Sequence, residues 1–75
     1  EIVLSDPTGG TFSVILPVAS LSTNLEVGVK NHSNSTNAII VDSQGTDIDG
    51  SPTDSIVTAR AYRQYKSTGT GFIVI

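Results

Sequence analysis

Residues 38–51 read AIIVDSQGTDIDGS, an apolar run followed by a polar turn that contains one further isoleucine. Four apolar residues, Ala38 to Val41, bounded by turn-forming residues predict a strand buried on both faces, because a helix would need a longer periodic run. Ile48 stands alone among polar residues, so we expect its side chain to plug into the core. The backbone is expected to turn around it at Asp47, Asp49 and Gly50, since Asp bonds its own main chain and Gly accepts positive φ.

Short segments with strand periodicity flank this stretch on both sides. Strands are expected at residues 1–4, 11–16, 25–30, 55–58, 60–66 and 72–75. Asp-Pro and Gly-Gly steps between the first two predict a hairpin connection. In the second strand, Phe12, Val14 and Leu16 are expected to face the core, and Pro17 closes the strand because proline cannot donate to a sheet ladder.

No segment shows a sustained helical period, so the fold class is all-β. We expect a small antiparallel β-sandwich or β-prism-like domain of six to eight short strands. Residues 1–75 form a single domain, and the absence of an initiating Met indicates a piece of a longer protein. A chain of this length buries only about 60% of its unfolded surface, so support from partner chains is expected.

Charge and composition exclude several function classes. Four basic residues against seven acidic ones, with a net charge of -3, argue against nucleic-acid binding. Arg60, Arg63 and Lys66 lie close in sequence, but strand alternation would send Arg63 to the opposite face, which disfavours a phosphate-binding patch. No run is long enough to span a membrane, so no membrane insertion is expected.

The chain shows no catalytic or metal-binding pattern. His32 is the one histidine, and it lies in a polar segment without a second metal ligand at suitable spacing, so we expect a solvated loop histidine, no metal, no cofactor and no enzymatic activity. A calcium-loop interpretation of Asp47 to Gly50 fails because Gly45 occupies an earlier ligand position and no Glu follows.

With catalysis and metal binding disfavoured, the remaining function to consider is the binding of a partner by exposed side chains. The polar segment 31–37 is expected to be an exposed loop, with candidate contact residues Asn31, His32, Asn34, Thr36 and Asn37. The segment 67–71 is a second candidate contact loop. Tyr62 and Tyr65 are candidate stacking residues for sugar rings, although they face opposite sides of one strand.

The order of these segments carries a resemblance. A strand that ends in Leu16-Pro17 is followed by an alternating strand that ends in Lys30-Asn31, and then by a polar loop. The turn Ile48-Asp49-Gly50-Ser51 comes next. An aromatic-bearing strand and a Gly turn into a terminal strand, at residues 69–75, complete the order. This arrangement resembles the β-structured modules of bacteriophage tail fibres, tail spikes and other virion appendages, with Phe72 where that family often has Trp.

The resemblance implies an extracellular, virion-borne module that attaches the phage to a host surface polysaccharide or protein. It also implies a homotrimer among other virion proteins, intertwined or packed so that residues such as Ile15, Ile39 and Val57 become buried. One alternative is a purely architectural connector or capsid-decoration module. Another is a carbohydrate-binding module of a secreted protein, which would need aligned aromatic rings on one exposed face.

Overall fold

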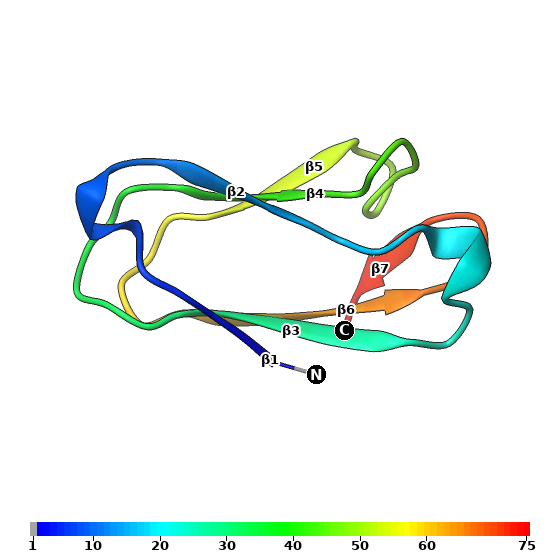
Figure 1. Cartoon of the computed structure of the whole chain (residues 1–75), viewed down its shortest axis with the longest axis horizontal. Coiled ribbons are helices and arrows are strands. Elements are labelled where there is room, and N and C mark those ends of the chain that lie inside the picture. The colour runs from blue at the N-terminus through cyan, green and yellow to red at the C-terminus, as the bar shows by residue number, and fades with distance from the viewer. Residues whose placement is uncertain (1) are drawn as a thin grey trace.

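The computed structural model describes residues 2–75, which form seven short strands in two sheets packed face to face (Figure 1). One sheet has the order β1-β3-β6-β7 and the other β2-β4-β5. The elements are β1 (Ile2–Ser5), η1 (Pro7–Gly9), β2 (Phe12–Ile15), η2 (Ala19–Leu21), β3 (Glu26–Asn31), β4 (Ile39–Asp42), β5 (Thr53–Ile56), β6 (Tyr62–Ser67) and β7 (Phe72–Val74). The predicted all-β sandwich of six to eight strands is confirmed.

Both sheets are mixed rather than antiparallel. β1 runs parallel to β3 and β2 runs parallel to β4, while the other three strand pairs are antiparallel. The predicted hairpin between the first two strands is wrong, because β1 and β2 belong to different sheets. Asp6 caps the intervening η1 by accepting a hydrogen bond of 3.0 Å from the backbone N–H of Thr8, and this turn carries the chain across the sandwich.

The core lies between the two inner sheet faces and includes residues from both sheets, among them Val27, Val29, Ile39, Val41, Ile56, Tyr65 and Phe72. β4 contributes Ile39 and Val41, whereas Ile40 and Asp42 on its other face are half-buried. The prediction of burial on both faces of this strand is therefore wrong, because only one side of the sheet is covered. Ile39, expected to be covered by trimerisation, is already buried within the single chain.

Ile48 plugs the sandwich as predicted and is 2% exposed. Its backbone N–H donates to the carbonyl of Ser51, and the neighbouring Asp49 N–H donates over 3.0 Å to the carbonyl of Phe72. Asp49 and Gly50 turn the chain with φ of 49° and 84°, the left-handed region that glycine adopts readily. The loop between β4 and β5 is thus tied to β7 as well as to itself.

A polar bridge also joins the sheets. Asp54 of β5 accepts hydrogen bonds from the Arg63 guanidinium at 2.9 Å and from the Tyr65 hydroxyl at 2.8 Å, both on β6. Burial alone would raise the pKa of Asp54, but these two donors outweigh it and hold the pKa below its ordinary value. β5 itself begins and ends two residues earlier than predicted, which leaves Val57 exposed after the strand.

Candidate functional site

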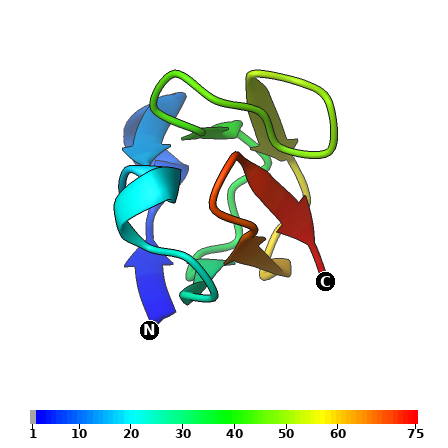
Figure 2. The ribbon, with the colours of Figure 1, turned by 90° about the vertical axis from the view of Figure 1, so that its right-hand side faces the viewer.

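Three connections meet at one end of the sandwich, at the left of Figure 1. They are residues 6–11 between β1 and β2, residues 32–38 between β3 and β4, and residues 57–61 between β5 and β6. We call these three connections the loop end. The opposite end carries η2, the loop that contains Ile48, and the turn between β6 and β7 (Figure 2).

Asn31 is the internal brace of the loop end. It is the last residue of β3 and is 0% exposed. Its side-chain amide donates to the carbonyls of Ser35 at 2.9 Å and Thr58 at 3.2 Å, and its Oδ1 accepts from the Ser33 hydroxyl at 2.7 Å. The prediction of Asn31 as an exposed contact residue is wrong, because its polar atoms are used to join two loops.

Further hydrogen bonds fix the segment 32–38 against its neighbours. The Asn37 amide donates to the carbonyl of Pro7 at 3.0 Å, and the backbone N–H of His32 donates to the carbonyl of Ser5 at 2.7 Å. Ser33 is buried, so the segment is only partly exposed. These hydrogen bonds tie the segment to β1 and to η1, so it is held in one conformation and is not an adaptable loop.

The side chains of His32, Asn34, Thr36 and Asn37 are exposed on this framework. The structure therefore brings four of the five candidate contact residues to one surface. The second candidate contact loop, residues 67–71, lies at the opposite end of the sandwich, and Ser67 and Gly71 within it are buried. The two candidate loops consequently present separate surfaces.

Arg60 also belongs to this surface, whereas the sequence predicted it in a strand at residues 60–66 together with Arg63 and Lys66. It lies outside β6, in a left-handed conformation with φ of 61°. Its backbone N–H donates to the Ser33 carbonyl at 3.1 Å, its Nε donates to Asn34 Oδ1 at 3.2 Å, and its carbonyl accepts from the Lys30 ammonium. Strand alternation could not place Arg60 because the residue belongs to a turn.

Asp6 adds a carboxylate to the loop end. Hydrogen bonds from the Thr8 hydroxyl and backbone N–H lower the pKa of Asp6 below its ordinary value, and the nearby charges of His32 and Arg60 act in the same direction. Its charge is therefore kept at neutral pH, and it lies in the electrostatic environment of His32 and Arg60.

The two tyrosines do not form a stacking platform. Tyr65 is 0% exposed and belongs to the core, so its prediction as a stacking residue is wrong. Tyr62 is exposed on the other face of β6, as alternation predicted, and its ring lies across Gly28 of β3. Its hydroxyl donates to Gln64 Oε1 at 3.2 Å, which fixes the ring flat on the sheet.

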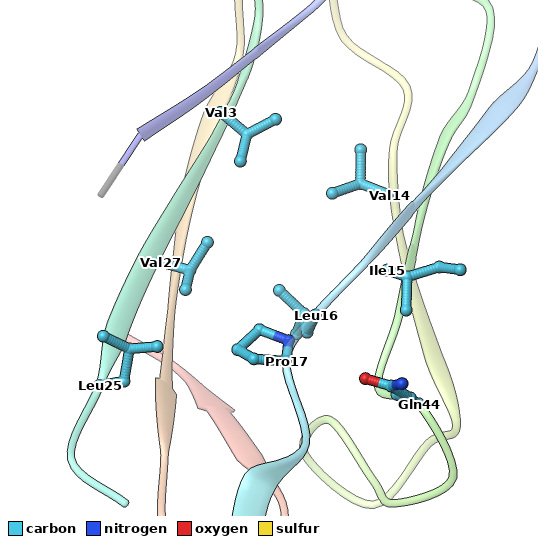
Figure 3. A pocket seen from close by; sticks show the side chains of 8 residues that line it. All are labelled: Val3, Val14, Ile15, Leu16, Pro17, Leu25, Val27 and Gln44. Carbon is cyan, nitrogen blue, oxygen red and sulfur yellow. The ribbon is translucent and has the colours of Figure 1, made fainter. Parts of the chain in front are cut away.

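An apolar groove of about 350 Å³ opens along the side of the sandwich where the edge strands β1 and β2 diverge (Figure 3). Val3, Leu25 and Val27 form one wall, and Val14, Ile15, Leu16 and Pro17 form the other, with Gln44 at one end. Among the lining side chains only that of Gln44 is polar. The groove is therefore suited mainly to apolar side chains.

Among residues 2–75 no group of three or more His, Cys, Asp or Glu side chains is arranged to hold a metal ion. The same part of the chain contains no helix that is long and apolar enough to cross a membrane. Comparisons of the sequence and structure with protein-family models, curated proteins and solved structures found no match.

Proposed function

We propose that this chain is a structural and receptor-binding module of a bacteriophage tail fibre or spike, which attaches the virion to the host cell surface. The proposal starts from the resemblance of the segment order to virion appendage modules. The observation that carries it is the loop end, where hydrogen bonds from Asn31 and Asn37 hold three connections together beneath exposed polar side chains.

The contact is passive and needs no catalytic group. A loop that is already ordered loses little conformational entropy on binding, so even short polar side chains such as those of His32, Asn34 and Thr36 contribute net affinity. Each contact with a host polysaccharide or protein remains weak, and several copies in one appendage multiply the weak contacts through effective concentration.

A homotrimer supplies those copies in this proposal. Ile15 on β2 lines the apolar groove and is 64% exposed, and Leu4, which follows the groove residue Val3 on the edge strand β1, is also 64% exposed. The molecule measures 33 × 20 × 16 Å, so one long side offers a footprint of the order of the roughly 800 Å² per partner seen in stable interfaces. Neighbouring copies packed against this side leave the loop end free to meet the host.

The test is an array of bacterial surface polysaccharides probed with the full chain. Replacement of the whole segment 31–37 would remove the Asn31 brace, so the sharper variant is the triple substitution His32→Ala, Asn34→Ala, Thr36→Ala. The matched control is Thr68→Ala with Thr70→Ala, two exposed residues at the opposite end. We expect the control to bind like the parent and the triple variant to lose binding. Binding unchanged in the triple variant, or absent in the parent, would contradict the proposal.

A purely architectural module is the second candidate, in which another virion protein, instead of a second copy of this chain, covers the apolar groove. If virion proteins cover both the groove and the loop end, no surface remains for the host. Cross-linking of assembled virions through a cysteine introduced at Thr36 distinguishes the two functions: cross-links to another virion protein support the architectural module, and their absence supports the receptor-binding one. The carbohydrate-binding module lacks its aromatic platform, because Tyr65 is buried.

A further inference from the structure

The charges of this acidic chain are unevenly distributed along its long axis. Among residues 2–75, Arg60 of the loop end and Lys30, at the adjoining end of β3, stand against one carboxylate, Asp6, which leaves a net charge of about +1 when His32 is neutral. Around the opposite end lie four carboxylates, Glu26, Asp42, Asp47 and Asp49, with Lys66 as the one cation. A molecule with a net charge of -3 thus has a positive end.

Neither Lys30 nor Arg60 forms an ion pair with a carboxylate of residues 2–75. Within residues 2–75 the one salt bridge joins Arg63 to Asp54. The Lys30 ammonium instead donates to the backbone carbonyl of Arg60, which brings the second charge to the same turn. Both positive charges thus belong to the turn before β6, and an anion bound at this turn is attracted by each of them.

Arg60 is also oriented for recognition. Its backbone N–H and carbonyl are both hydrogen-bonded, and its Nε is bound to Asn34 Oδ1 at 3.2 Å. This bond leaves the two terminal nitrogens of the guanidinium to a ligand, in the planar arrangement that matches a carboxylate or phosphate.

We propose that the loop end binds the anionic substituents of an acidic polysaccharide, with Arg60 and Lys30 holding the negative group and His32 and Asn34 contacting the adjoining sugar hydroxyls. The inference rests on the proposed function and narrows its receptor from surface polymers in general to those that carry carboxylate or phosphate groups. Asp6 lies close by and disfavours ligands of very high charge density, such as nucleic acid.

The test compares oligogalacturonate with the same oligosaccharide after methyl esterification, which removes the charge and keeps the sugar. Isothermal titration with the full chain is expected to give affinity for the free acid that is at least about tenfold higher than for the ester, and that falls with added salt. Competition by inorganic phosphate separates recognition of any anion from recognition of the carboxylated sugar.

Arg60→Gly removes the guanidinium and suits the left-handed backbone, so this variant is expected to fold. It should weaken binding of the free acid by about tenfold or more, a loss of about 1.4 kcal/mol, and Lys30→Met should act in the same direction. Lys66→Ala removes a cation from the opposite end and should leave binding unchanged.

Equal affinity for acid and ester, no affinity for either, or full affinity in the Arg60→Gly variant would overturn the inference. Its failure is distinguishable from failure of the proposed function. A neutral polysaccharide bound in a manner that depends on His32, Asn34 and Thr36 would leave the receptor-binding function supported and the anionic receptor excluded.

Discussion

Asn31 has a strong influence on the loop end, because a single buried amide satisfies groups from two separate loops. Its side chain contacts the backbone of Ser35 and Thr58 and the hydroxyl of Ser33. An apolar replacement would remove the donor to the Ser35 carbonyl and the acceptor of the buried Ser33 hydroxyl, whereas the Thr58 carbonyl would keep the backbone N–H of Ala61 as a donor. A polar group left unpaired costs more than its hydrogen bond contributes.

Asn31→Ala should therefore destabilise the fold by about 2–3 kcal/mol, since three hydrogen bonds are lost in a buried position. Urea unfolding followed by circular dichroism measures the effect. Thr36→Ala is the control, because Thr36 is exposed in the same loop and should change stability by less than about 0.5 kcal/mol. Equal stability of both variants would mean that the brace contributes nothing.

Asp54 links stability to pH through its bridge with Arg63 and Tyr65. Because its pKa is lowered in the folded state, its stabilising contribution is present above the unfolded value of about 3.9 and is lost as pH falls through the lower folded value. Asp54→Asn should cost about 1 kcal/mol at pH 7, and the difference from the parent should shrink below about pH 4. A difference that stays constant between pH 7 and pH 3 would contradict this account.

Between elements, Gly28 and Tyr62 form a matched pair on the outer face of the first sheet. A Cβ built on Gly28 would lie 2.6 Å from Cε1 of Tyr62 and closer still to its hydroxyl, so any side chain there must displace the ring. Glycine is an unfavourable residue within a strand such as β3, and the ring of Tyr62 covers the backbone that Gly28 leaves without a side chain.

Gly28→Ala should cost about 0.5–1 kcal/mol in the parent and become neutral or stabilising when combined with Tyr62→Ala, because alanine is then the better strand residue. A double-mutant cycle by thermal or urea unfolding gives the coupling energy. Additive effects of the two substitutions would show that the ring and the glycine do not interact.

The positions of the strands and the residues that face inward could be predicted from the alternation of apolar and polar residues, because this alternation reflects burial of one face of a sheet. Ile48 could be assigned to the core because it is isolated among polar residues, and the Val27 and Val29 alternation placed β3 correctly. Sheet membership could not be predicted, since the Asp6-Pro7 step is compatible with a hairpin and with a crossover. The contact between Lys30 and Arg60 could not be predicted either, because it arises only when β3 and the turn before β6 meet in three dimensions.

For the whole molecule, the proposed function assigns assembly to the side that carries the apolar groove and receptor contact to the loop end. Light scattering at about 10 μM, far above the Kd of a nanomolar assembly, should give the mass of a trimer. Leu4→Lys with Ile15→Lys should yield a folded monomer, because both side chains are exposed on the edge strands beside the groove and neither lies in the core. A parent chain that is monomeric, or a variant that remains trimeric, would contradict this packing.

Receptor binding at the loop end is tested most directly by a ¹H–¹⁵N NMR titration of the chain with an oligosaccharide prepared from a polysaccharide that it binds on the array. We expect amide shift changes confined to residues 6–11, 30–38 and 57–61. Changes centred on the groove or on the opposite end, or no changes at all, would contradict the assignment of the loop end as the receptor-binding surface.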